Sequence, residues 1–213
     1  MQASIPKPYL RLGHRYLIDV TLERLLGVGP ISEIYLALHA EDKWWPQCDS
    51  AASTRIHPYI GGSERVDSVR AGLDRIRDGA AADDWVLVHD VARPCVAVDD
   101  IERLLAALAG NPVGGLLAAQ IVDTVKEVAA DARITRTVDR KSLWRALTPQ
   151  VFRFQVLDCA LREASRNAAA VTDEASAVEA LGLRPQVISG SPDNIKITHP
   201  ADLALAEWLL GKG

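Results

Sequence analysis

The chain has 213 residues, of which 48% are hydrophobic and 24% are charged, a composition typical of a single globular domain. Its net charge of −4 provides no basic field for a phosphate backbone, which argues against nucleic acid as the main partner. No apolar run approaches the roughly 20 residues that a membrane-spanning helix needs, and the first residues lack the pattern of a secretory signal. We therefore expect a cytoplasmic protein with no membrane partner. Its three scattered cysteines indicate neither a disulfide framework nor a zinc site.

The first half of the chain alternates apolar runs with segments of helical spacing, which is typical of an α/β domain with a mainly parallel sheet. We expect a helix at residues 16–26, strands at 31–38 and 55–60, a helix at 63–77 and a buried strand at 85–88. In the second helix Val66, Val69, Leu73 and Ile76 recur at helical spacing and predict one apolar face. The sequence from Asp99 to Glu102 resembles a capping box and predicts a helix over 101–109.

The second half contains a segment of a different kind. Residues 115–119 predict a strand, and 123–139 alternate in the manner of a β-hairpin with no fully apolar face. This hairpin is either an arm that pairs with another subunit or an ordinary exposed hairpin. Helices are then expected at 152–167, after a cap at Thr172, and at 200–210 after a cap at Thr198, with strands at 186–189 and 195–197.

Polar residues that follow a strand are the first candidates for function, because ligands of open parallel sheets bind beyond the carboxyl ends of the strands. After the strand at 55–60, Gly61 and Gly62 allow a close approach of backbone amides to an anion, or they form a plain turn. After the strand at 85–88 come His89, Asp90 and Arg93. The last two could bind a metal-bound phosphate and an anionic substrate, or could pair with each other.

Three further features carry cations or hydroxyls. Thr124, Arg140 and Thr148 lie at the base and far side of the hairpin, where such residues are usually solvated. In the sequence NIKIT the two isoleucines are expected to face the core, so Lys196 points the opposite way, toward solvent or toward a phosphate. Lys7 lies in a loop stiffened by two prolines.

These residues include cations, hydroxyls and one carboxylate, but no evident nucleophile. The chain offers no Ser-His-Asp or Cys-His set, no HExxH and no Walker A sequence, which removes the usual support for hydrolase, zinc-protease and P-loop functions. Positioning and charge neutralisation are what phosphoryl or nucleotidyl transfer requires of a protein. The sequence therefore favours a transfer reaction of that kind.

Seven segments, in order, resemble the motifs of the 2-C-methyl-D-erythritol 4-phosphate cytidylyltransferase family. They are PKPYL (6–10), GGSERVDSVRAGL (61–73), VLVHDVARPCV (86–96), DTVKEV (123–128), TVDRKSLWRALTPQVF (137–152), VTDEASAVEALG (171–182) and NIKITHPADLALAE (194–207). The resemblance implies a single Rossmann-like nucleotidyltransferase domain over residues 1–213, with helices on both faces of its sheet. It also implies a projecting β-arm at about 121–142, through which two subunits form a homodimer.

The reaction implied by the resemblance transfers CMP from CTP to 2-C-methyl-D-erythritol 4-phosphate. Its products are CDP-methylerythritol, used in isoprene biosynthesis, and pyrophosphate, and its cofactor is Mg²⁺. The resemblance gives catalytic roles to Lys7 at the triphosphate and to Arg140 and Lys196 at the substrate phosphate. It places Gly62, Ser63, Ser68 and Asp90 on the CTP side, and Arg93, Thr124, Thr148 and Thr172 on the substrate side, with some of these residues supplied by the partner's arm. The magnesium ion would be held mainly by the phosphates of CTP, with Asp90 nearby.

Two departures from the family pattern affect the expectations. Ser63 stands where the family often has Asp. The family pattern also begins with an apolar strand and a glycine-rich loop that carries a catalytic arginine, whereas Met1 stands where that loop should end. We expect the natural protein to carry roughly a strand and a loop more. Two alternatives stay open: a cytidylyltransferase for ribitol 5-phosphate, and a catalytically silent nucleotide-binding dimer.

Overall fold

The computed structural model describes residues 5–167 and 171–211. Its first half contains β1 (Arg11–Leu12), β2 (Arg15–Tyr16), α1 (Leu17–Leu26), β3 (Ile34–Leu38), β4 (Ile56–Ile60), α2 (Arg65–Ile76), β5 (Trp85–Val88) and α3 (Val98–Leu108). The second half contains β6 (Gly114–Gln120), β7 (Val125–Val128), β8 (Ile134–Val138), β9 (Trp144–Arg153), α4 (Phe154–Arg166), α5 (Glu174–Ala180), β10 (Gln186–Ser189) and α6 (Pro200–Leu210). Short 3-10 helices are η1 (Lys7–Tyr9), η2 (Trp45–Gln47), η3 (Asp49–Ala52) and η4 (Arg140–Ser142).

The main sheet is mixed, so the expectation of a mainly parallel sheet was wrong. Its strand order is β10-β6-β9-β5, in which β10 is parallel to β6 while β9 is antiparallel to both of its neighbours. The chain leaves β6 into the hairpin and returns from it as β9, so β9 must run against β6. The parallel pair β3 and β4 forms a separate sheet, and no ladder joins it to β5 among the strands of the described residues.

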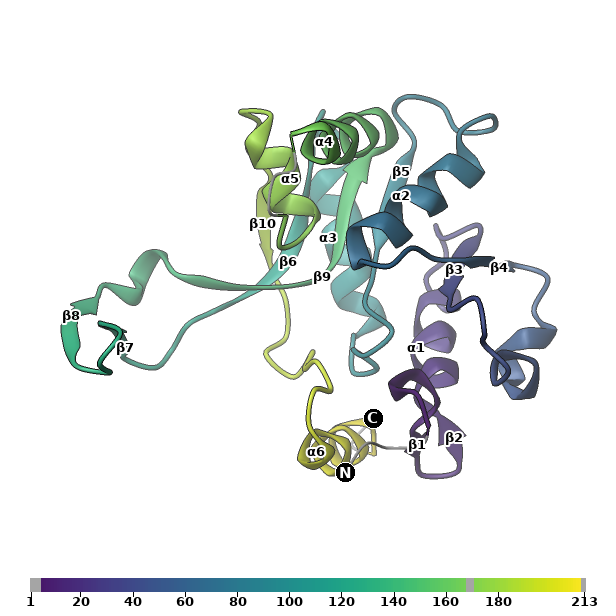
Figure 1. Ribbon diagram of the computed structural model, residues 1–213, viewed down its shortest axis with the longest axis horizontal. Coiled ribbons are helices and arrows are strands. Elements are labelled where there is room, and N and C mark those ends of the chain that lie inside the picture. Colours follow the sequence, from purple (N-terminus) through teal and green to yellow (C-terminus); the bar gives the residue numbers. More distant parts are fainter. Residues whose placement is uncertain (1–4, 168–170, 212–213) are drawn as a thin grey trace.

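Helices cover both faces of the main sheet, as expected (Figure 1). Successive side chains of a strand point to opposite faces, and neighbouring leucines of β6 follow this rule. Leu116 packs with the buried residues of α2, α4 and α5, whereas Leu117 packs with Leu104 and Leu108 of α3. The apolar face predicted for α2 also exists, since Leu73 is buried and Val66, Val69 and Ile76 pack against the same core.

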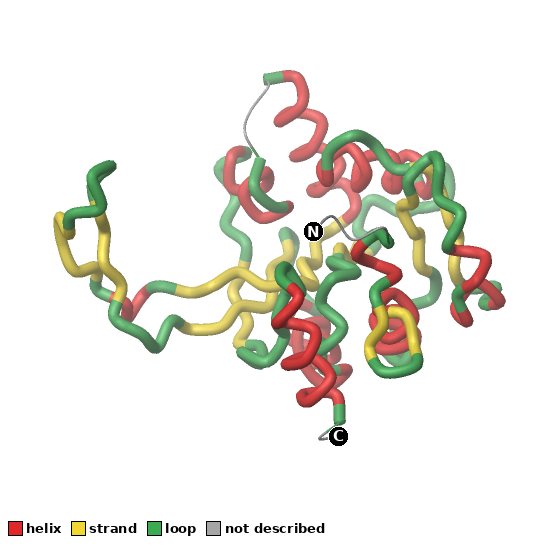
Figure 2. The backbone as a smooth tube through the Cα atoms, turned by 60° about the horizontal axis from the view of Figure 1, so that its bottom comes forward, coloured by secondary structure: helices red, strands yellow, loops and turns green. Residues whose placement is uncertain are grey.

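The predicted hairpin is an arm that stands away from the body of the molecule (Figures 1 and 2). Strands β7 and β8 pair only with each other in the described part of the chain. Val128 and Ile134 on the arm are 55% and 63% exposed. The arm therefore contributes almost nothing to the core of its own subunit.

Strand β9 was missed in the sequence, where a helix was expected to begin at residue 152 instead of Phe154. The misleading residue is Pro149, because proline is uncommon within a central strand. Here the ladder between β6 and β9 shifts its register between Leu116 and Ala118, beside this proline. The irregularity lets β9 continue through a residue that donates no backbone hydrogen bond.

Several local expectations were also wrong. The strand at 85–88 is partly exposed along its whole length, because β5 is an edge strand that pairs only with β9 within the described residues. Helix α3 follows Ala97 without a side-chain cap, so Asp99 is not its N-cap. The caps of α5 and α6 are Asp173 and His199, each one residue after the threonine expected there. Residues 195–197 form no strand, although the amide of Ile197 donates to the carbonyl of Ala92 at 2.8 Å.

Candidate active site

Asp90 forms the centre of a group of charged residues just beyond the end of β5. Its side chain is 12% exposed, with Oδ2 lying 2.8 Å from Nζ of Lys196 and Oδ1 3.0 Å from Nε of Arg65. Nε of Arg93 lies 3.7 Å from Oδ2. Burial alone would raise the pKa of Asp90, but the hydrogen bond from Lys196 and the positive charges of Arg65 and Lys196 outweigh it and lower that pKa to about 2. Asp90 is therefore a carboxylate at neutral pH.

Lys196 reaches this carboxylate because its neighbours anchor the backbone. Ile197 is 1% exposed and Ile195 is partly buried against the core beside α6, while the side chain of Lys196 is 44% exposed. The sequence-based expectation that Lys196 points away from the two isoleucines is thus confirmed. The ammonium group has three hydrogens, so it can bind Asp90 and still offer a donor to a ligand.

Arg65 and Glu174 complete the group. Arg65 is the first residue of α2, and its Nη1 and Nη2 donate to Oε1 and Oε2 of Glu174 at 2.5 and 2.8 Å. Glu174, the first residue of α5, is 1% exposed. We refer to Arg65, Asp90, Arg93, Glu174 and Lys196 as the Asp90 cluster.

His89 and Thr148 hold the loop that carries Asp90. The Thr148 hydroxyl accepts the backbone amide hydrogen of Asp90 at 3.1 Å and lies 3.0 Å from Nδ1 of His89. Nε2 of His89 lies 3.2 Å from the carbonyl oxygen of Arg93. These partners assign a neutral ring with its hydrogen on Nε2, which accepts the threonine hydroxyl hydrogen at Nδ1. Burial is the main reason that the pKa of His89 falls to about 4.

The glycine turn before α2 lies at the surface beside this cluster. The amide of Gly62 donates to the hydroxyl of Ser68 at 3.1 Å, and the Ser63 hydroxyl lies 3.2 Å from a carboxylate oxygen of Asp67. A Cβ atom at Gly62 would lie 2.2 Å from the Cβ of Asp67, so this turn conformation has no room for a residue with a side chain at position 62. Gly62 and Ser63 are exposed, which leaves them accessible to a ligand.

The structure brings some of the expected site residues together and separates others. Asp90, Arg93, Thr148 and Lys196 meet, and Arg93 also donates from Nη1 to the carbonyl oxygen of Asn194 at 2.8 Å. Four others are exposed and make no hydrogen bond or ion pair with this group in the described structure: Lys7 on η1, Thr172 just before the cap of α5, and Thr124 and Arg140 on the arm.

Sequence reasoning named neither Glu174 nor Arg65 as a candidate site residue. Arg65 does lie in a motif that was singled out, directly after the glycine turn, and this position was a usable signal. Glu174 also lies in a segment that was singled out, 171–182, but its pairing with Arg65 could not be read from the sequence because the two residues are 109 positions apart.

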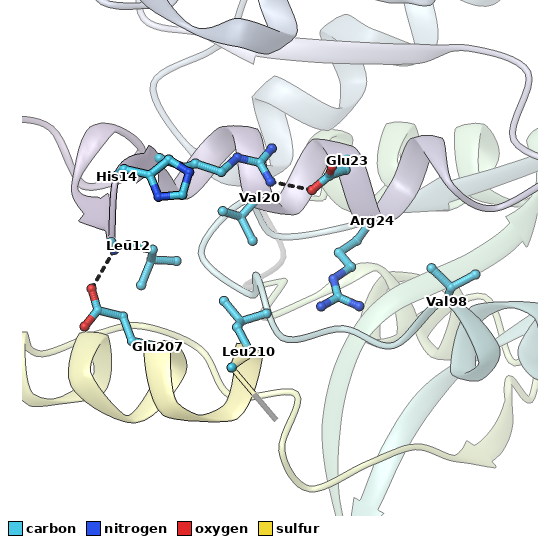
Figure 3. Close-up of a pocket in the computed structure, with 11 residues that line it drawn as sticks. Leu12, His14, Val20, Glu23, Arg24, Val98, Glu207 and Leu210 are labelled. Atoms are coloured by element: carbon cyan, nitrogen blue, oxygen red, sulfur yellow. Dashed lines mark hydrogen bonds and ion pairs between the residues drawn. The ribbon is translucent and has the colours of Figure 1, made fainter. Parts of the chain in front are cut away.

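A separate hollow of about 720 Å³ lies between the β1–β2 turn, α1 and the end of α6 (Figure 3). Leu12, Val20, Arg24, Val98 and Leu210 are among its lining residues. Its polar groups are largely paired, since Glu23 binds Arg15 and Glu207 accepts the amide hydrogen of Gly13 at 2.7 Å. It contains no member of the Asp90 cluster, so we place the candidate chemistry at the cluster and not in this hollow.

Residues 5–167 and 171–211 contain no cluster of metal-binding side chains and no membrane-spanning helix. No three His, Cys, Asp or Glu side chains of these residues gather in a way that could hold a metal ion. No helix within the same ranges is long and apolar enough to cross a membrane.

Comparison with known proteins identifies the family. The family profile described as 2-C-methyl-D-erythritol 4-phosphate cytidylyltransferase matches residues 1–212. A protein of that description from Hahella chejuensis is 49% identical over 210 residues, which cover 99% of this chain and 87% of the relative. One from Vibrio parahaemolyticus is 43% identical over 212 residues, covering 100% and 90%.

Solved structures agree with this assignment. The crystal structure of the Francisella tularensis 2-C-methyl-D-erythritol 4-phosphate cytidylyltransferase superposes with a TM-score of 0.85 at 36% identity. The superposition covers 96% of this chain and 93% of that one. Because sequence and fold match over nearly the whole chain, this protein belongs to the 2-C-methyl-D-erythritol 4-phosphate cytidylyltransferase family.

Proposed function

We propose that this chain transfers CMP from CTP to 2-C-methyl-D-erythritol 4-phosphate, forming CDP-methylerythritol and pyrophosphate. The observation that carries the proposal is the Asp90 cluster, which gathers three cations around one carboxylate beyond β5 in a chain of this family. Two anionic substrates must approach each other in this reaction. Fixed cations reduce their repulsion without the reorganisation that solvent would need.

The reaction requires one bond to form and one to break. A phosphate oxygen of the methylerythritol phosphate attacks the α-phosphorus of CTP, and the bond from that phosphorus to the β-phosphate oxygen breaks as pyrophosphate leaves. Lys196 and Arg140 hold the attacking phosphate in line, and Lys7 stabilises charge at the α-phosphate. The attacking oxygen is already anionic, so the step needs positioning more than it needs a general base.

The other site residues bind the two substrates. Gly62, Ser63 and Ser68 hold the cytosine and ribose. The exposed position of Gly62 and Ser63 before α2 supports this, as does the hydrogen bond between the amide of Gly62 and the hydroxyl of Ser68. Arg93, Thr124, Thr148 and Thr172 act on the substrate side. The Thr148 hydroxyl is bonded to His89 and to the amide of Asp90, so in this conformation it acts through the loop that carries Asp90.

A magnesium ion fits the donor chemistry of this site. Asp90 is ionised, slightly exposed and adjacent to the proposed phosphate positions, and carboxylate and phosphate oxygens are the ligands that Mg²⁺ prefers. Asp90 would hold the ion together with the phosphates of CTP. When bound, the ion would neutralise charge on the triphosphate.

We also propose a homodimer formed through the arm. Its support is the exposed apolar surface of Val122, Val128 and Ile134, which are 77%, 55% and 63% exposed. Arg140 and Thr124 lie on the same arm. The arm stands away from the body of the molecule (Figure 2). A second subunit that receives the arm would bring these residues to its Asp90 cluster.

The deciding experiment measures pyrophosphate release by the 213-residue chain with CTP, Mg²⁺ and 2-C-methyl-D-erythritol 4-phosphate, with ribitol 5-phosphate in a parallel reaction. Faster turnover of the methylerythritol phosphate supports the proposal. Faster turnover of ribitol 5-phosphate would replace it with the related polyol phosphate reaction. CTP binding without pyrophosphate release from either substrate would identify a catalytically silent nucleotide-binding protein.

A further inference from the structure

Glu174 is a buried carboxylate for which the proposed reaction provides no role. It is 1% exposed, and both of its oxygens accept hydrogen bonds from the Arg65 guanidinium. Burial of a carboxylate is costly unless it is paired in good geometry and hydrogen-bonded. A bidentate contact with arginine satisfies that condition and also fixes the plane of the guanidinium.

The same guanidinium contacts a second carboxylate. While its Nη1 and Nη2 are held by Glu174, its Nε donates to Oδ1 of Asp90 at 3.0 Å. Because the guanidinium is planar and rigid, two contacts on one side determine where the third donor points. The contact with Glu174 therefore determines how Arg65 presents Nε to Asp90.

Asp90 passes this constraint to Lys196. Its Oδ2 lies 2.8 Å from Nζ of Lys196, so three ion pairs connect Glu174, Arg65, Asp90 and Lys196 in series. These residues come from four separate parts of the fold: the start of α5, the start of α2, the loop after β5 and the segment before α6. The side chains along the series are 1% exposed at Glu174, 37% at Arg65, 12% at Asp90 and 44% at Lys196. The series begins in the protein interior and ends at an ammonium group that a ligand can reach.

We propose that Glu174 is a positioning residue, which orients Asp90 and Lys196 for nucleotidyl transfer by locking the Arg65 guanidinium. The inference rests on the proposed function. Glu174 touches neither substrate in this assignment, so its effect on turnover passes entirely through Arg65. A contact that merely joined α2 to α5 would stabilise the fold but would leave turnover per folded molecule unchanged.

The test compares Glu174→Gln with wild type under saturating CTP and methylerythritol phosphate. Glutamine keeps the size of the side chain but has one acceptor oxygen and no charge, so it cannot hold both arginine nitrogens. We expect kcat to fall at least about tenfold while both KM values change less than about threefold, because geometry at the reacting atoms is lost more than affinity. An unchanged kcat in an active, folded variant would overturn the inference while leaving the proposed function intact.

A matched control exists at the opposite end of α2. Arg77, which follows α2, makes a similar two-point contact with Asp158 at 2.5 and 3.0 Å. Asp158→Asn removes that contact without touching the Asp90 cluster, so we expect its kcat to stay within about twofold of wild type. A tenfold fall in this control as well would show that joining α2 to its neighbour is what matters, and would overturn the positioning role.

Two further measurements keep the inference testable if Glu174→Gln folds poorly or if wild type is inactive. Arg65→Lys retains the charge but cannot bind Glu174 at two points, and we expect it to lower kcat as Glu174→Gln does. Combining the two substitutions should cost no more than the worse single change, because each of them breaks the same connection from Glu174 through Arg65 to Asp90. Additive losses would overturn the inference.

The second measurement does not depend on turnover. The carbon-13 resonance of the Asp90 carboxyl should shift in Glu174→Gln, although the two carboxylates are joined only through Arg65, and should stay fixed in Asp158→Asn. An Asp90 resonance that does not respond to Glu174→Gln would overturn the inference. Failure of wild type to release pyrophosphate would instead reject the proposed function, and with it any role of Glu174 in that reaction.

Discussion

Tyr9 anchors the short helix η1 that carries Lys7, and the hydrogen bond of its hydroxyl can be removed alone. The ring is 2% exposed, and the hydroxyl donates to Oδ2 of Asp42 at 2.5 Å. A hydrogen bond to a charged acceptor contributes about 1.5–3 kcal/mol to stability. Asp42 keeps two backbone amide donors on its other oxygen, both at 2.9 Å, so the loss in Tyr9→Phe should lie near the lower limit, about 1.5 kcal/mol.

Urea unfolding at pH 7 measures this loss as a lower midpoint with an unchanged slope. Tyr35→Phe is the matched control, since the hydroxyl of Tyr35 donates to Glu33 at 3.2 Å on an exposed surface. Its cost should stay below about 0.5 kcal/mol. Equal effects of the two substitutions would refute the reasoning, because they would show that burial and the short contact at Tyr9 add nothing to the free energy of unfolding.

The pH dependence provides a second check on the same contact. Burial raises the pKa of Asp42, but hydrogen bonds from Tyr9 and from two backbone amides outweigh it and leave that pKa below its usual value. A carboxylate with a lowered pKa in the folded protein contributes stability that is complete above its unfolded pKa and is lost as the pH falls. The difference between wild type and Tyr9→Phe should therefore shrink as the pH falls below about 4. A difference that grows in acid would contradict this assignment.

Three further outcomes are expected. Lys196→Ala should lower turnover about 100-fold but change stability by less than about 1 kcal/mol, because the contact with Asp90 is partly exposed; wild-type turnover would remove Lys196 from the site. Deletion of residues 125–137 should give monomers in sedimentation, whereas a persistent dimer would place the interface elsewhere. His89, whose pKa is about 4 in the folded protein, should make stability rise between pH 4 and 6.5 by up to about 3 kcal/mol. His89→Gln should remove much of that rise, so a wild-type slope in this variant would contradict the neutral ring.

Local elements could be predicted from the sequence because their signals are local. The apolar spacing in α2, the alternation in the arm, and strands β5 and β10 all depend on neighbouring residues, and they appear where they were expected. Helix caps were less predictable. Before α5 and before α6, either of two adjacent polar residues could be the N-cap, and the N-caps in the structure are Asp173 and His199. Strand β9 was missed because Pro149 suggests a break unless the register of the neighbouring ladder is known.

The candidate site was predictable only in part. Asp90 and Arg93 could be singled out because they follow an apolar strand, and ligands bind beyond the carboxyl ends of strands in open α/β sheets. Lys196 could be singled out because it lies between two isoleucines expected to face the core. Their partners could not be chosen in the same way. Arg65 meets Glu174 across 109 residues, and Thr148 meets His89 across 59.

By itself the sequence determined the helices, most of the strands, the hairpin that forms the arm, and a set of charged and hydroxyl residues suited to phosphate chemistry. It did so because backbone periodicity and residue chemistry are properties of short segments. The tertiary structure decided the direction of β9, the separation of β3 and β4 from the main sheet, and which charges pair. Those outcomes depend on distances between remote segments, since an ion pair or a strand ladder forms only where folding brings its two halves together.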